Sequence, residues 1–137
     1  IEVILALFLL GIIVATFLPL INTALVNIKL TNERYHMILL AESIIEQLIN
    51  FNYEGSENIY ILDMKLVDII DMLCESDEVN ISLPKTRKNE QGNYTCNIYK
   101  NNFNENLWDI TVKISYHGEK RIKDVVLQAY MEKINKN

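Results

Sequence analysis

Residues 1–21 form an almost wholly apolar segment. They read IEVILALFLLGIIVATFLPLI, and the only charged side chain among them is that of Glu2. A helix of this length measures about 30 Å, which matches the hydrocarbon thickness of a bilayer. The sequence therefore predicts a membrane-spanning helix over residues 1–21.

Glu2 is the residue of this segment that most needs an explanation. A carboxylate at the mouth of an apolar helix costs up to about 3 kcal/mol unless it lies at the interface or meets a positive partner. A secretory signal peptide is disfavoured, because no Lys or Arg precedes the apolar run and no small-residue cleavage site follows it. An ordinary signal anchor, with Glu2 at the interface, stays open as an alternative to a functional carboxylate.

Pro19 interrupts the backbone hydrogen bonding expected of this helix. It lacks an N–H group and clashes with the carbonyl four residues before it. We therefore expect a kink or a locally melted turn between about Ala15 and Leu20.

Residues 22–50 continue the helix with an amphipathic pattern. Apolar residues recur there at spacings of three and four, at Ile38, Ala41, Ile45 and Leu48. Carried from Ile1 to about Asn50, one helix would measure roughly 75 Å. We expect its second half to be half buried by the rest of the chain.

Residues 51–137 are too few for two cores and predict one small head domain. A loop at 52–58 leads to a short helix capped by Asp63, whose apolar face is formed by Leu66, Ile69, Ile70 and Leu73. Alternating residues then predict strands at Val79–Leu83, Tyr94–Ile98, Trp108–Tyr116 and about Ile122–Met131. Because these strands follow one another like hairpins, we expect an antiparallel sheet that buries the apolar stripe of the helix, an α+β fold.

The sequence offers no pattern for catalysis, a cofactor or a metal. His36 and His117 lie at no ligand spacing, and no phosphate-binding glycine loop is present. The acidic cluster Glu75, Asp77 and Glu78 lacks the glycine and spacing of a calcium loop, which favours a solvated turn. We expect a non-enzymatic protein with no catalytic residues, cofactor or metal.

A small basic loop is the only pattern that points to nucleic acid. It contains Lys85, Arg87 and Lys88, without interleaved aromatic residues, in a chain of net charge −5. This pattern favours ordinary loop solubility over DNA contact, and DNA uptake is kept as a hypothesis without further support.

Three stretches together resemble the type IV pilin superfamily. The first stretch begins with Ile1, Glu2 and Val3 and continues as an apolar run to Pro19. Pro19 lies seventeen residues after Glu2. The second is AESIIEQL at 41–48, and the third is WDITVKISYHGEKRIKDVVLQAYMEK at 108–133, similar to the terminal hairpin of I-type minor pseudopilins and V-type minor pilins. In the family pattern the glutamate is the fifth mature residue, so this chain would lack the first three.

This resemblance implies a structural subunit of a type IV filament, a type II secretion machine or a DNA-uptake machine, in a tip or initiation complex. It implies cleavage by a prepilin peptidase, N-methylation, storage in the cytoplasmic membrane with the head outside, and assembly into a surface filament. The expected partners are other minor and major pilins or pseudopilins, the assembly machinery and the membrane. Glu2 would pair with the N-terminal amine of a neighbouring subunit, and Pro19 would give the helix compliance during assembly. The alternative is a single-pass anchored extracytoplasmic binding or sensor domain.

Two cysteines, Cys74 and Cys96, complete the candidate residues. A head outside the cytoplasm is exposed to oxidation, so a Cys74–Cys96 disulfide is one expectation and two buried free thiols are the other. The enclosed loop of about 22 residues would contribute on the order of 3 kcal/mol.

Overall fold

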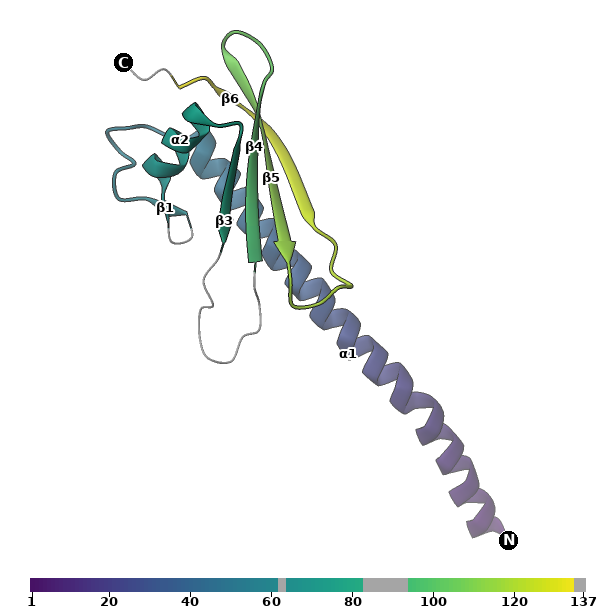
Figure 1. Cartoon of the computed structure of the whole chain (residues 1–137). Helices are drawn as coiled ribbons and strands as arrows, with labels where there is room; N and C mark the ends of the chain where they lie inside the picture. The colour runs from purple at the N-terminus through teal and green to yellow at the C-terminus, as the bar shows by residue number, and fades with distance from the viewer. Residues whose placement is uncertain (62–63, 83–93, 135–137) are drawn as a thin grey trace. The chain divides into compact units, whose positions relative to one another are not determined.

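The computed structural model describes residues 1–61, 64–82 and 94–134. The element order is α1 (Glu2–Ile49), β1 (Tyr60–Ile61), β2 (Met64–Lys65), α2 (Leu66–Glu75), β3 (Glu78–Ser82), β4 (Tyr94–Asn102), β5 (Leu107–Tyr116) and β6 (Val125–Glu132). The chain divides into two compact units, Ile1–Glu33 and Arg34–Asn137. The expected α+β class, with a long N-terminal helix and antiparallel sheets, is confirmed (Figure 1).

The first unit is helical. Every residue from Ile1 to Leu25 is exposed, and the large apolar side chains among them are between 46% and 103% accessible. No apolar core of its own covers this segment. Its covering must come from an environment outside the chain, because soluble proteins rarely leave so large an apolar surface in water.

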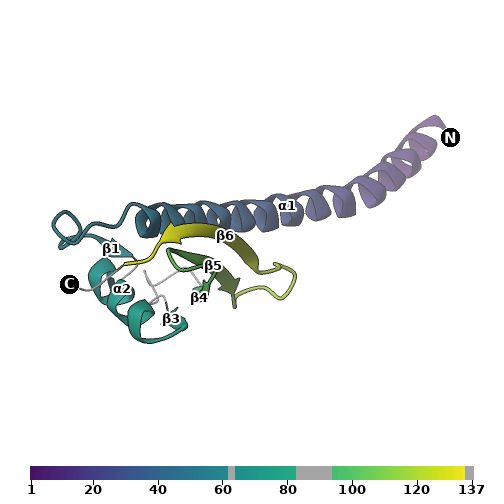
Figure 2. The same ribbon diagram turned by 90° about the horizontal axis from the view of Figure 1, so that it is seen from above.

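The second unit is built on a four-stranded antiparallel sheet in the order β3-β4-β5-β6. Each strand pairs with the next along the chain, and the register is fixed by pairs such as Ile81 with Cys96, Ile98 with Val112 and Ile114 with Val125. The Arg34–Ile49 part of α1 lies across one face of this sheet (Figures 1 and 2).

The core lies between this helix segment and the sheet. Alternate residues of β5 are buried, at Trp108, Ile110, Val112 and Ile114, so the period of two places them all on one face. The buried residues of α1 are Met37, Ala41, Ile44 and Leu48. Two of the four expected positions, Ala41 and Leu48, are therefore confirmed, whereas Ile38 and Ile45 are only half-buried.

The short helix α2 forms where the sequence predicts it, and Leu66, Ile69, Ile70 and Leu73 are all buried. Its expected cap is wrong, since the N-cap residue is Lys65, with extended backbone and no side-chain hydrogen bond. Asp63 itself lies outside the described residues. The two-residue pairing of β1 with β2 just before α2 has no signal in the sequence pattern.

Candidate functional site

The apolar half of α1 is the first candidate site. The helix is long and apolar enough to cross a membrane, and its most apolar part is not buried. Backbone hydrogen bonds within a helix satisfy the polar groups that lipid would leave unpaired. α1 is therefore a candidate membrane-spanning helix.

Glu2 lies in the first turn of this helix and is exposed. A negative charge is favoured at a helix N-terminus, where the first N–H groups have no partner within the helix. Among the ion pairs of the described residues, none involves Glu2. Its carboxylate is therefore accessible to a cationic group of another molecule.

Pro19 lies inside α1, and the helix continues through it without a break. Of the two expected outcomes, the locally melted turn is absent from α1, and the kink stays a prediction. Hydroxyl groups bond to the backbone on both sides of the proline: Thr16 Oγ1 donates to the carbonyl oxygens of Ile12 and Ile13 at 3.0 and 2.9 Å, and Thr23 Oγ1 donates to that of Pro19 at 2.9 Å. The role of Pro19 in helix compliance stays a prediction.

An open hollow of about 380 Å³ lies between the last turns of α1 and the edge strand β6. Ile45, Ile49 and Leu127 contribute apolar side chains, and Glu42 and Glu46 stand on the helix beside them. The two carboxylates are four residues apart and exposed. Residues four apart are neighbours on a helix surface, so they form one acidic ridge. The sequence analysis gave these two glutamates no role.

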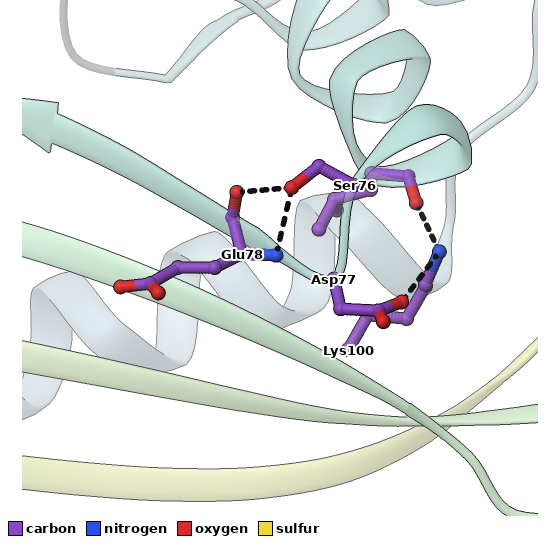
Figure 3. Close-up of polar contacts among 5 residues, drawn as sticks. Ser76, Asp77, Glu78 and Lys100 are labelled. Carbon is purple, nitrogen blue, oxygen red and sulfur yellow. Dashed lines mark hydrogen bonds and ion pairs between the residues drawn. The ribbon is translucent and has the colours of Figure 1, made fainter.

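A buried lysine is the polar centre that the sequence analysis missed (Figure 3). Lys100 occupies a core-facing position of β4 and is 7% exposed. Its ammonium donates a hydrogen bond to the carbonyl oxygen of Leu73, in the last turn of α2. It also lies 3.3 Å from Asp77 Oδ1 and 5.0 Å from the centre of the Trp108 ring.

This arrangement joins the end of α2 to the sheet. The last carbonyls of a helix have no partner within it and carry partial negative charge, so a cation there is favourable. The backbone strengthens the junction, since Lys100 N–H donates to the Asp77 carbonyl at 2.8 Å and Ser76 N–H to the Met72 carbonyl, also at 2.8 Å. Ser76 Oγ further donates to the Glu78 carbonyl at 3.0 Å (Figure 3). The cluster is suited to holding elements together rather than to catalysis.

The exposed residues of the acidic cluster are spread over three elements, since Glu75 ends α2, Asp77 lies in the bend that follows and Glu78 begins β3. Within the described residues, no group of three or more His, Cys, Asp or Glu side chains is placed to hold a metal ion. His117 accepts or donates a 2.7 Å hydrogen bond with Thr95 Oγ1 at the surface. The basic loop residues Lys85, Arg87 and Lys88 lie outside the described residues.

The sheet face opposite α1 is polar and crosslinked between strands. Gln128 Nε2 donates to both carboxylate oxygens of Asp109, at 2.8 and 2.7 Å. Lys113 Nζ lies 3.0 Å from Asp124 Oδ2 near the start of β6. The hydrogen bond from Lys113 lowers the pKa of Asp124, and the same bond raises the pKa of Lys113. These contacts join neighbouring strands at an exposed surface.

The two cysteines lie on different elements, Cys74 in α2 and Cys96 in β4, and both are free thiols in this structure. Cys96 is 0% exposed, and burial raises its pKa from 9.0 to about 12. The disulfide stays a prediction. Intact mass after alkylation of the unreduced, denatured native protein would show two labels for free thiols and none for a disulfide.

Alkaline pH should destabilise the chain through Cys96. The pKa of the Cys96 thiol is near 9 in the unfolded chain and about 12 in the folded one. The contribution of this thiol to the free energy of unfolding is therefore complete below pH 9 and is lost as the pH rises towards 12. We expect the free energy of unfolding of the wild-type protein to be roughly 2 kcal/mol lower at pH 10.5 than at pH 7.5. Cys96→Val should not show this loss. Urea unfolding of both reduced proteins at pH 7.5 and 10.5 measures this difference, and equal losses would contradict it.

Comparison of the chain with protein-family models, with curated proteins and with solved structures finds no match.

Proposed function

We propose that this chain is a minor pilin or pseudopilin, a non-enzymatic subunit that is held in a membrane by α1 and then packed into a type IV filament or a related secretion or uptake machine. The observation that carries the proposal is the first half of α1. It is apolar and exposed throughout, with one carboxylate in its first turn. The same helix continues into a segment that packs on an antiparallel sheet.

The apolar half of α1 is suited to two environments in turn. In lipid it satisfies its own backbone hydrogen bonds, and in a filament the same side chains pack against neighbouring helices. Glu2 distinguishes this use from a plain anchor, because a carboxylate gains most from a cationic partner once lipid or protein has displaced water around it. In the proposed filament that partner is the N-terminal amine of the adjacent subunit.

Replacement of Glu2 by glutamine tests the role of its charge. Glutamine keeps the size and polarity of the side chain but cannot form an ion pair with an amine. We expect the membrane-bound amount to stay unchanged and the amount in sheared surface fractions to fall at least about tenfold, the equivalent of roughly 1.4 kcal/mol. The matched control is Glu57→Gln, an exposed glutamate of the head. Equal sheared amounts for wild type and Glu2→Gln would favour the anchored binding or sensor domain.

The mature N-terminus provides an independent test. We expect the native protein to begin three residues before Ile1 with a methylated amine, as intact mass and N-terminal sequencing would show. An uncleaved or differently cleaved protein confined to membranes would contradict it.

A further inference from the structure

The edge strand β6 has one side without a partner strand. The sheet order is β3-β4-β5-β6, so among the described strands β6 pairs with β5 alone. Its sequence, VVLQAYME, contains no Lys, Arg or Pro. Natural proteins commonly protect a long edge strand with such residues or with a covering helix or loop, because its free N–H and C=O groups otherwise pair with another chain. The outer edge of β6 is therefore open to a further strand wherever the rest of the chain leaves it uncovered.

The helix α1 covers this edge only in part. Its second-unit part runs alongside β6 (Figure 2), and the hollow of about 380 Å³ remains between Ile45 and Ile49 of the helix and Leu127 of the strand. The Gln128 side chain does not fill the hollow, because it donates hydrogen bonds to Asp109 on the far face of the sheet. The space beside β6 is therefore lined by exposed and half-buried apolar side chains.

The exposed apolar surface of this helix segment lies on the same side as the hollow. Its exposed large apolar side chains are Tyr35, Leu39 and Ile49, and Ile49 lines the hollow. Tyr35 precedes Glu42, and Leu39 precedes Glu46, by seven residues, close to two helical turns, so each shares a side of the helix with a residue of the hollow. The other side of the buried stripe carries His36, Ser43 and Gln47. An apolar surface rimmed by polar residues is typical of an interaction site.

We propose that the free edge of β6 and the adjoining hollow form a docking site for an extended segment of a partner protein, one that carries Lys or Arg alternating with apolar residues on the face it turns to α1. In this mode main-chain hydrogen bonds to the edge strand supply affinity, and pockets for every second side chain supply specificity. All residues of the site belong to the second unit, so the proposal holds for a filament subunit and for an anchored binding domain alike.

The spacing of the α1 side chains fits an added strand. A strand paired with β6 would lie about 4.8 Å from it, in the space beside Ile45 and Ile49. Its side chains on one face recur about every 6.6 Å, and residues four apart on a helix recur about every 6 Å along its axis. Successive inward side chains of the added strand would therefore meet successive turns of α1, at Ile45 and Ile49 or at Glu42 and Glu46.

Charge complementarity identifies the partner segment as basic. Glu42 and Glu46 stand beside the hollow, are exposed, and take part in no ion pair among the described residues. Like charges four residues apart on a helix repel, and a cation placed between them removes that repulsion. The stem of a Lys or Arg can lie on Ile45 and Ile49 while its charged end reaches the two carboxylates. The net charge of −5 also attracts a cationic segment rather than an acidic one.

Peptide binding to the full-length chain tests the site. The chain is placed in phosphatidylcholine nanodiscs, whose lipid carries no net charge, and empty nanodiscs provide the blank. The probe is a fluorescein-labelled, end-capped peptide, Thr-Leu-Thr-Lys-Thr-Leu-Thr-Lys-Thr, whose Leu and Lys share one face when it is extended. We expect a saturable rise in its fluorescence anisotropy with the chain and none with empty nanodiscs. Absence of a saturable rise would overturn the proposal.

Charge exchange tests the role of the two glutamates. Glu42→Lys combined with Glu46→Lys should lower the affinity for the lysine peptide at least about tenfold, and should raise the affinity for a peptide with both Lys replaced by Glu by a similar factor. The matched control is Glu54→Lys with Glu57→Lys, two exposed glutamates before β1, which changes the net charge equally. It should leave both affinities within about twofold of the wild-type values. An equal effect of the two double variants would mean that net charge alone governs binding and would overturn the proposal.

N-methylation of the peptide tests pairing with the strand edge without any change to the protein. Alternate residues of a strand direct their N–H groups to opposite edges. A peptide methylated on the main-chain nitrogens of its Leu and Lys residues and one methylated on those of its inner Thr residues are therefore blocked on opposite edges. We expect one of them to bind like the parent peptide and the other to lose at least about tenfold in affinity. Equal affinities of the two methylated peptides would overturn pairing with β6.

Two further readouts separate the docking site from folding and from the proposed function. Unchanged Trp108 fluorescence shows that the head of each variant is folded, because Trp108 is buried in the sheet core. Glu2→Gln should bind the lysine peptide with wild-type affinity, because Glu2 lies in the first unit. Weaker binding by this variant would place the peptide on the first unit and overturn the proposal. The amount of Glu2→Gln in sheared fractions is read separately, so failure of the docking site and failure of the proposed function are distinguishable.

Discussion

Leu48→Ala should lower the free energy of unfolding by about 3 kcal/mol, whereas Leu39→Ala, on the same helix, should change it by less than about 0.5 kcal/mol. Leu48 is 0% exposed and Leu39 is 43% exposed. Truncating a buried leucine removes its burial energy and leaves a cavity, while truncating a leucine on the outer face removes neither. The two changes have the same effect on helix propensity, so their difference isolates the packing of α1 on the sheet.

Trp108 provides the signal for this comparison. It is the one tryptophan of the sequence and is 6% exposed in the sheet core. Urea unfolding of the full-length chain in detergent, followed by Trp108 fluorescence, gives the free energy of unfolding of each variant. Similar losses for Leu48→Ala and Leu39→Ala would contradict the observed orientation of α1.

Lys100→Met should lower the free energy of unfolding by about 2 to 3 kcal/mol. Methionine keeps much of the apolar stem but removes the ammonium that bonds to the Leu73 carbonyl and contacts Asp77. The buried carbonyl then lacks its charged donor, and the end of α2 loses the cation that stabilises it.

The matched control for Lys100 is Asp77→Asn. The Asp77 side chain is 82% exposed, so water screens its ion pair. Such a pair should contribute less than about 0.5 kcal/mol to the free energy of unfolding. The urea midpoint followed by Trp108 fluorescence measures both variants. A large effect of Asp77→Asn with a small effect of Lys100→Met would mean that the ion pair, and not the bond to α2, stabilises the junction.

Hydrophobic pattern was sufficient to predict the main elements of this chain. The uninterrupted apolar run fixes a helix at the N-terminus, and alternation at Trp108, Ile110, Val112 and Ile114 fixes a strand with one buried face. These signals are strong because each is repeated over many residues. Strand ends were less well predicted, since β4 extends to Asn102 rather than Ile98.

Pattern alone could not choose between neighbouring apolar residues of α1. Met37 and Ile38, and likewise Ile44 and Ile45, are adjacent pairs, and either member could begin a stripe with spacings of three and four. The sheet buries Met37 and Ile44 and keeps Ala41 and Leu48 buried, which rotates the buried stripe by about half a residue from the predicted one. That rotation also leaves Leu39, Glu42 and Glu46 facing outward.

The sequence by itself determined that the apolar first part of α1 needs lipid or another molecule to cover it. No second apolar segment of similar length is present in the sequence to pack against residues 1–21. Only the tertiary structure decided the role of Lys100. A lysine among alternating residues reads as solvent-exposed, and its burial depends on the carbonyl of Leu73, 27 residues earlier in the chain. Local pattern reports which residues prefer to leave water, whereas a buried charge is decided by the partner that folding brings to it.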